Sequence, residues 1–286
     1  MTAPKTHTLD APGATITYDV REAETSDVPV LLLIGSPMGA DGFATLAGYF
    51  PDRTVVTYDP RSAGRSRRTD GARETTPDEH ADDLHRVIGA VGGGPVDIFA
   101  TSGGAVNALV LVTKHPEVVR TLVAHEPPAA QVLPDREQAL AATENIRDTY
   151  QESGLGPAMA KFITLVMLKG PIPAGFGQRP VDPSAFGLPT QDDGARDDPL
   201  VGQNIITCTH HQHDFDAVRA ASTRVVVAVG EESEGEMAYR AGKIVAERLG
   251  SAAVIFPSHH GGFMGPESGP MQGKPEAFAA KLREVL

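Results

Sequence analysis

Ala100-Thr101-Ser102-Gly103-Gly104 places a serine among small residues where a predicted strand gives way to a predicted helix. The apolar residues of 96–100 predict a buried strand, and 105–114 has helical spacing with no interior Gly or Pro. A residue in so tight a turn must adopt strained backbone angles, and its side chain then projects from the edge of the sheet. The stretch therefore predicts a nucleophile elbow centred on Ser102.

The small residues around Ser102 have separate roles in this interpretation. Ala100 and Gly104 let strand and helix pass close together, and Gly103 leaves its backbone N–H free to point at a developing oxyanion. The stretch departs from the common pattern G-x-S-x-G, because alanine takes the place of the first glycine. On these residues alone, an ordinary glycine-rich turn of an α/β domain is the alternative.

The composition indicates a globular protein with an excess of acidic groups. Its 286 residues suit one large domain with an insertion or two small domains, and 41% hydrophobic residues supply a sizeable core. A formal net charge of -12 and a pI near 5.2 would repel nucleic-acid phosphates and anionic lipids. We therefore expect no nucleic-acid partner and no membrane partner.

Two further features bear on location and redox chemistry. Segment 1–10 is polar and lacks the apolar core of a signal peptide, and no later apolar stretch reaches membrane-spanning length. We therefore expect a cytoplasmic protein. Cys208 is the only cysteine, which excludes an internal disulfide and a thiolate metal cluster, and we interpret it as a small buried hydrophobic residue.

Strands and helices alternate along most of the chain. Segments 6–9 and 14–20, on either side of Ala11-Pro12-Gly13, predict a β-hairpin. Thr76, Pro77 and Glu79 predict a capping box at the start of a helix that runs towards residue 91. The other predicted strands are 30–34, 53–58, 119–124, 224–230 and 252–256, and the other predicted helices of this pattern are 43–50, 236–249 and 275–286.

The pattern changes between residues 129 and 222. Helical stretches at 137–152 and 157–168 precede a loop rich in Pro and Gly at 170–198. We interpret 129–222 as a helical cap inserted into an α/β core that comprises 1–128 and 223–286. The alternation in the core predicts a mainly parallel, doubly wound sheet that gathers its ligands at the carboxyl ends of the strands.

The order of the core motifs resembles that of the α/β-hydrolase superfamily, and the resemblance covers nearly the whole chain apart from the cap. Its marks are the Gly35 loop, Tyr58-Asp59-Pro60-Arg61 with Gly64-Arg65-Ser66, the Ser102 elbow and the late His260-Gly261-Gly262-Phe263. The resemblance implies an eight-stranded, mainly parallel sheet with helices on both faces. It also implies that Ser102 attacks an acyl carbon.

A serine hydroxyl needs a base to take its proton and later return it to the leaving group. The resemblance aligns His260 with the family histidine, because Gly262-Phe263 follows it at the family spacing. His259 is the neighbouring alternative. The other interpretation of both is a pair of histidines on a surface loop.

The acid that orients the imidazole departs from the commonest family pattern. Family members often carry Asp three residues after the glycine that ends the seventh strand, whereas Ser233 stands there in this chain. We favour Glu126, at the end of the sixth predicted strand, as in relatives such as the haloalkane dehalogenases. Glu232 or Glu231 is the alternative, and the chain order Ser, acid, His fits each choice.

The resemblance also places an oxyanion hole and a pocket. We assign the two oxyanion N–H groups to Ser36 and Gly103, although Ile34 stands where many relatives have His. We predict that Met38, Met159, Phe162 and Phe263 line the substrate pocket.

We expect no metal and no cofactor. In the cluster His210-His211-x-His213 with Asp214, two histidines three residues apart could share one face of a helix and bind a metal. The sequence contains no other carboxylate-histidine pattern at the spacing of zinc ligands, so a cap helix near the pocket is the simpler interpretation. Asp59 and Arg61 are predicted to stabilise their turn as a pair.

The sequence thus predicts a cofactor-free serine hydrolase. We expect it to cleave a small-to-medium, largely uncharged ester or lactone through a Ser-His-acid triad and an acyl-enzyme. C–C bond hydrolysis or perhydrolase activity uses the same arrangement, and a ligand-binding homologue without turnover is the alternative of a different class. The sequence is compatible with a homodimer.

Overall fold

The computed structural model describes residues 3–23 and 27–286, which form one nine-stranded sheet in the order β1-β2-β4-β3-β6-β7-β8-β9, with β5 paired to β2. The pairs of β2 with β1, β4 and β5 are antiparallel, and the pairs from β4 through β9 are parallel. The strands are β1 (Lys5–Ala11), β2 (Ala14–Arg21), β3 (Leu31–Ile34), β4 (Val55–Tyr58), β5 (Arg67–Arg68), β6 (Val96–Thr101), β7 (Val119–His125), β8 (Arg224–Gly230) and β9 (Val254–Phe256).

The parallel strands end at one edge of the sheet, and their register places four of these ends side by side. Ile34 pairs with Ala100, Thr101 with His125, and His125 with Ala228. Since the residues after parallel neighbours emerge at the same edge, the loops that follow β3, β6, β7 and β8 meet there.

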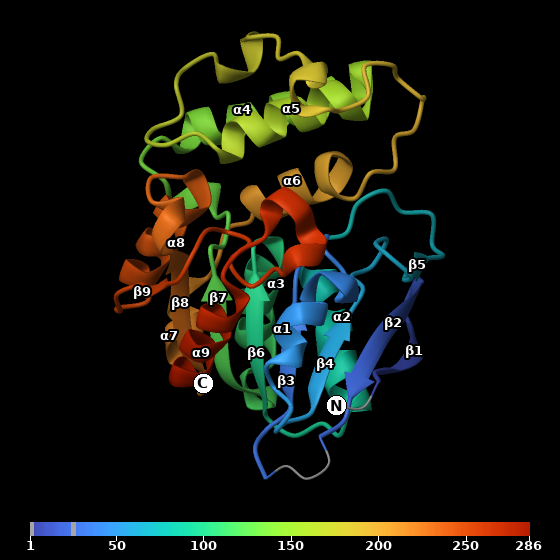
Figure 1. Ribbon diagram of the computed structural model, residues 1–286, viewed down its shortest axis with the longest axis vertical. Helices are drawn as coiled ribbons and strands as arrows, with labels where there is room; N and C mark the ends of the chain where they lie inside the picture. The colour runs from blue at the N-terminus through green and yellow to red at the C-terminus, as the bar shows by residue number, and fades with distance from the viewer. Residues whose placement is uncertain (1–2, 24–26) are drawn as a thin grey trace.

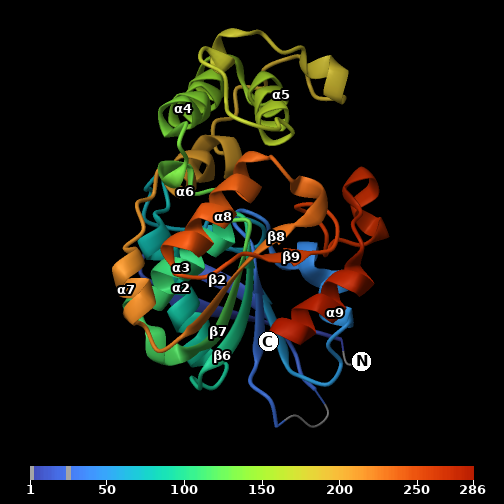
Figure 2. The same ribbon diagram turned by 90° about the vertical axis from the view of Figure 1, so that its left-hand side faces the viewer.

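Helices cover both faces of the sheet, as the mainly parallel pairing requires. Figure 2 shows α1 and α9 on one side of the strands and α2, α3 and α7 on the other. These helices, with α8 near β8, are α1 (Ala44–Gly48), α2 (Pro77–Ala90), α3 (Gly103–Lys114), α7 (Phe215–Ala220), α8 (Met237–Arg248) and α9 (Pro275–Val285). The described helices include none with the length and hydropathy needed to cross a bilayer.

The two sides of the sheet bury separate hydrophobic clusters. The larger includes Ile98 and Leu122 of the central strands with Leu109 of α3, and the smaller is rich in phenylalanine, with Phe99 and Phe278 fully buried. All six residues of β6 are buried, which accounts for its nearly continuous apolar sequence. The sheet is therefore a rigid support for the loops at its carboxyl edge.

A helical layer lies over this edge (Figure 1). It consists of α4 (Arg136–Ser153), α5 (Leu155–Val166) and α6 (Ile205–Thr209) with the loops between them, which we call the cap. The predicted helices at 137–152 and 157–168 correspond to α4 and α5. The predicted cap boundary at residue 222 includes α7, but α7 lies beside α3 against the core (Figure 2).

The prediction of eight strands misses β5, because two residues are too short for any alternating pattern. The helix expected at 43–50 is shorter: a 3-10 turn, η1 (Ala40–Phe43), leads into α1. The capping box at α2 is confirmed, since the Thr76 hydroxyl accepts from the Glu79 N–H and the Glu79 carboxylate accepts from the Thr76 N–H.

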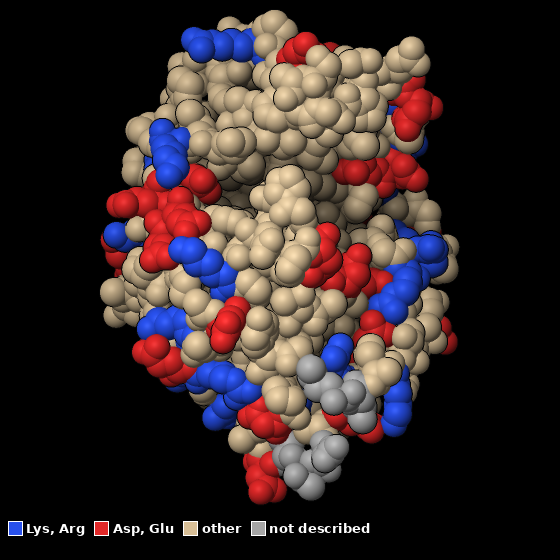
Figure 3. Space-filling model, in the orientation of Figure 1, with Lys and Arg blue, Asp and Glu red and all other residues tan. Residues whose placement is uncertain are grey.

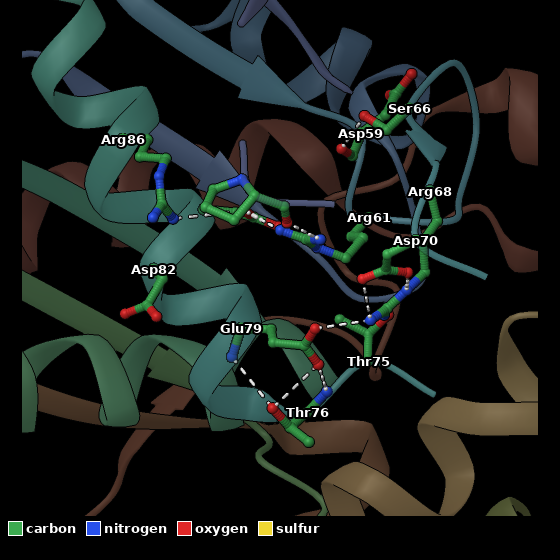
Figure 4. A network of polar contacts seen from close by, with 12 residues as sticks. Asp59, Arg61, Ser66, Arg68, Asp70, Thr75, Thr76, Glu79, Asp82 and Arg86 are labelled. Atoms are coloured by element: carbon green, nitrogen blue, oxygen red, sulfur yellow. Dashed lines mark hydrogen bonds and ion pairs between the residues drawn. The ribbon is translucent and has the colours of Figure 1, made fainter. Parts of the chain in front are cut away.

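The predicted pairing of Asp59 with Arg61 is wrong, although both side chains do stabilise structure. Asp59 accepts from Arg65 Nε at 2.6 Å and from the Ala40 N–H at 2.9 Å, so it joins two loops. Arg61 instead reaches α2, where its Nε and Nη2 donate to the two carboxylate oxygens of Asp83 at 2.9 and 2.7 Å. Figure 4 shows Arg61 and Arg68 between this turn and the start of α2.

The bidentate Arg61–Asp83 pair is almost completely buried, with 3% and 0% of the two side chains exposed. Removing one partner would leave a buried charge without compensation, and we expect Asp83→Ala to lower the free energy of unfolding by about 3–5 kcal/mol. As a control, Glu284→Ala removes an exposed i,i+3 pair with Lys281 and should change it by less than about 1 kcal/mol. Urea denaturation of both variants measures the difference, and equal losses would contradict this role for Arg61.

Candidate active site

Ser102 occupies a strained turn between β6 and α3. Its φ is 56° and its ψ −132°, a left-handed conformation that residues other than glycine rarely adopt. The Ser102 N–H donates to the carbonyl of His125 at 3.0 Å, which fixes the turn against β7. A Cβ on Gly104 would lie 2.8 Å from Gly35 Cα, so glycine is required for this close approach. The predicted geometry of the elbow is present.

Glu126 and His260 are hydrogen-bonded at the same edge of the sheet. Glu126 follows β7, and its Oε2 lies 2.5 Å from Nδ1 of His260. Its other oxygen accepts from the Gly230 N–H at 2.8 Å, so both carboxylate oxygens have partners although the side chain is fully buried. The residue itself has a φ of 46°, a second left-handed position beside Ser102.

The Glu126–His260 contact shifts the pKa of both groups. Burial alone would raise the pKa of Glu126, but the hydrogen bond and charge of His260 outweigh it, and the pKa lies well below its ordinary value. Burial would lower the pKa of His260, and the same hydrogen bond to Glu126 instead raises it. The carboxylate thus stays ionised and favours a proton on the imidazole.

Ser102 and His260 line one cavity of about 450 Å³ between the core and the cap. In the described ranges the Ser102 side chain makes no hydrogen bond, and the serine is partly exposed to the cavity. Hydrogen bonds of catalytic groups are often long before a substrate binds and tighten in the complex.

The alternative acids lie elsewhere. Glu232 is exposed and pairs with Lys274 at 2.7 Å, and the same lysine lies 3.3 Å from Glu231. His259 also lines the cavity, but its ring nitrogens have other partners: its Nε2 lies 3.2 Å from the Gln272 carbonyl, and its Nδ1 accepts from the Gly261 N–H. Of the alternatives left open by the sequence, the structure brings Glu126 and His260 together.

The two residues assigned to the oxyanion hole are neighbours in space. Ser36 and Gly103 both line the cavity beside Ser102. A Cβ on Gly103 would lie 2.6 Å from the Ser36 carbonyl oxygen and 3.0 Å from Cys208 Sγ, so a larger residue there would collide with the loop after β3. The absence of a side chain at Gly103 lets the loop after β3 lie against the start of α3.

The profile of the alpha/beta hydrolase fold family matches residues 28–170, which is half of the chain. The chain belongs to the alpha/beta hydrolase fold family. YraK of Bacillus subtilis (strain 168), an uncharacterised hydrolase, is 29% identical over 264 residues, which cover 90% of this chain and 89% of that protein.

Two solved structures share the fold of this alpha/beta hydrolase. A thermophilic esterase from Thermogutta terrifontis has a TM-score of 0.65 at 18% identity, with 99% of this chain and 97% of the esterase covered. The enol-lactonase from Burkholderia xenovorans LB400 has a TM-score of 0.66 at 13% identity, with 98% and 99% covered. At such identities the likeness concerns the fold.

The cavity of this hydrolase is mostly apolar, and only part of its lining was predicted. Phe162 of α5 lines it, but Met38, Met159 and Phe263 do not. Phe263 is buried under the sheet, where its ring stacks on Phe43 at 5.3 Å, and Met38 packs against the same cluster. Met159 packs into the cluster on the other side.

Most of the cap residues that line the cavity could not be predicted from the sequence, since they belong to no motif. Met167 and Met271, both strongly exposed, lie at its mouth, and Figure 3 shows this face hollowed between cap and core with mostly uncharged surface around the hollow. The cap residues missed are Thr143, Leu165, Leu200, Asn204 and Ile205, among others, and Glu236 of the core was missed as well.

The histidines of the cap do not converge on a common point for a metal. His210 Nε2 lies 3.1 Å from Thr143 Oγ1, and His211 packs edge-on against His213. Within the described residues, three donor atoms approach one another only at His85, His115 and Glu117, remote in sequence from the elbow. The two histidine rings there stack in parallel, with their centroids 3.8 Å apart.

Proposed function

We propose that this alpha/beta hydrolase is a serine hydrolase that cleaves a small-to-medium, uncharged carboxylic ester or lactone. The observation that carries the proposal is the buried Glu126 carboxylate bound to His260, which shares a cavity with the strained Ser102 elbow. A serine, an imidazole and a carboxylate serve nucleophilic catalysis in unrelated folds, where they are recognised by geometry and not by their order in the chain.

In the proposed mechanism, Ser102 Oγ attacks the acyl carbon while His260 takes its proton. The negative charge on the former carbonyl oxygen would be met by the N–H groups of Ser36 and Gly103. Collapse of the intermediate breaks the bond to the leaving alkoxide, which takes the proton from His260, and leaves Ser102 acylated. Water, deprotonated by His260, then hydrolyses the acyl-enzyme and restores the serine.

The cavity supports an uncharged substrate. Apolar side chains of the cap form most of its wall, and Glu236 is the one carboxylate among the described residues that line it. Burial, and then the nearby Glu126 charge, raise the pKa of Glu236, which reflects its apolar surroundings. A substrate carboxylate would be repelled by Glu236 and would find no lysine or arginine in the described lining.

Reaction with a fluorophosphonate probe tests the proposal. We expect covalent labelling of the intact protein at Ser102, located by mass spectrometry of the peptide that contains it, together with turnover of p-nitrophenyl butyrate. A protein that binds a ligand without turnover would release no p-nitrophenol. Absence of both labelling and turnover would refute a serine hydrolase.

The pH dependence should report His260. A protonated imidazole cannot act as a base, and the contact with Glu126 raises the pKa of His260 above its ordinary value of 6.5. We therefore expect kcat/KM for p-nitrophenyl butyrate to decrease as the pH is lowered, with a midpoint above about pH 6.5. An acid limb centred below that value would contradict the pairing in the working enzyme.

A further inference from the structure

Asn204 of the cap touches the loop that carries Ser36. It ends a π-helical turn, η6 (Leu200–Asn204), and leads into α6, which lies between the upper cap helices and the core (Figure 1). The Ser36 hydroxyl donates to Asn204 Oδ1 at 2.7 Å, across 168 positions of sequence. Both residues are buried, so water competes little for this hydrogen bond.

The amide of Asn204 is held in one orientation. Its Nδ2 donates to the Pro199 carbonyl at 2.9 Å, and its backbone N–H donates to the same oxygen at 3.0 Å, the i to i−5 bond of the π turn. Oδ1 is thereby turned towards Ser36. π turns are rare and often lie at functional sites. This one places the acceptor Oδ1 of Asn204 against the loop after β3.

Cys208, one turn further along α6, extends the same contact to Gly103. Its thiol donates to Asn204 Oδ1 at 3.3 Å and lies 3.0 Å from the place where a Cβ of Gly103 would stand. Burial raises the pKa of this thiol to about 12, so it remains a neutral donor. The cap therefore contacts both residues to which we assign the oxyanion N–H groups.

We propose that Asn204 is a positioning residue for the oxyanion hole, an inference that rests on the proposed serine hydrolase function. Its carbonyl oxygen fixes the Ser36 side chain, and with it the backbone N–H of Ser36 on the loop after β3. A donor displaced by about 1 Å stabilises the oxyanion poorly, and such displacement costs roughly a hundredfold in rate. The cap thus helps to assemble the catalytic site as well as enclosing the substrate.

A double-mutant cycle tests the coupling. Asn204→Ala and Ser36→Ala each remove one side of the hydrogen bond and keep both backbone donors. We expect each to lower kcat for p-nitrophenyl butyrate by about 10- to 100-fold with KM changed less than about threefold, and the double variant to be no slower than the slower single variant. Asn204→Ser, too short to reach Ser36, should match Asn204→Ala and replaces it if alanine prevents folding.

A matched control and a second measurement separate positioning from stability. Gln203 lies in the same π turn, and its side chain makes no hydrogen bond among the described residues, so Gln203→Ala should leave kcat unchanged. A boronic acid that imitates the tetrahedral intermediate should bind Asn204→Ala more weakly by the factor lost in kcat. Losses that multiply in the double variant, or that fall on KM alone, would overturn the inference.

The experiments distinguish a failure of the proposed function from a failure of the role proposed for Asn204. If wild-type protein neither reacts with fluorophosphonate nor hydrolyses the ester, the serine hydrolase proposal itself is refuted. If Ser102 is labelled while the cycle shows independent effects, only the role of Asn204 is refuted.

Discussion

Ser102→Ala should abolish ester hydrolysis, with kcat reduced at least about a thousandfold and to background within most assays. The elbow leaves this serine partly exposed to the cavity without a hydrogen bond, whereas the other hydroxyls of the described lining, those of Ser36, Thr143 and Thr209, are each bound to an acceptor. Because Ala100 and Gly104 already fit this turn with little or no side chain, alanine at position 102 should fold normally. Stopped-flow or steady-state release of p-nitrophenol measures the loss.

Labelling and stability complete this test. The fluorophosphonate adduct expected with wild-type protein should disappear in Ser102→Ala. The urea midpoint should stay the same, because the Ser102 side chain makes no hydrogen bond in the described ranges and alanine keeps the same Cβ at this positive φ. Labelling that persists in Ser102→Ala would assign the nucleophile to another residue. Cys208 is a poor candidate for that role, since its thiol is buried and its raised pKa keeps it protonated.

An element of the fold could be predicted from the sequence where interactions between neighbouring residues determine it. Thr76 and Glu79 satisfy each other's backbone N–H groups within one turn, so their capping box is readable from four residues. The buried strand β6 is readable because both of its faces are covered. By contrast, β5 exists only through pairing with β2, and the partner of Arg61 lies on α2, so both depend on contacts distant in sequence.

Some residues of the candidate site could likewise be predicted from the sequence, and others could not. Ser102 and Glu126 directly follow strands and His260 comes four residues after one, so the topology of a parallel sheet brings all three to one edge. The topology of the sheet does not predict which side chains line the cavity. Met38 and Phe263 are apolar residues near the edge, and only the packed structure shows that they face the phenylalanine cluster instead of the cavity. Asn204 belongs to no motif, and a π turn leaves no periodic signal.

The choice of acid for the proposed triad can be tested by replacing Glu126. Glu126→Gln should lower kcat by about ten-thousandfold, the scale seen when a buried triad carboxylate becomes an amide. The Gly230 N–H already donates to one side of residue 126, so a glutamine would place its carbonyl oxygen there and turn its NH2 group towards His260. An amide donor at Nδ1 favours the tautomer with the proton on Nε2, which cannot accept the proton of Ser102.

Glu232→Gln provides the matched control for this choice. It removes the same charge from an exposed side chain that binds Lys274, and kcat should stay within about twofold of the wild-type value, because an exposed ion pair contributes little. Circular dichroism and urea denaturation should show both variants folded. The reverse outcome, full activity in Glu126→Gln and loss in Glu232→Gln, would mean that the 231–233 loop moves to His260 in the working enzyme. A hydrogen bond to the buried Glu126 makes that movement costly, since His260 would leave an ionised carboxylate in the core without its partner.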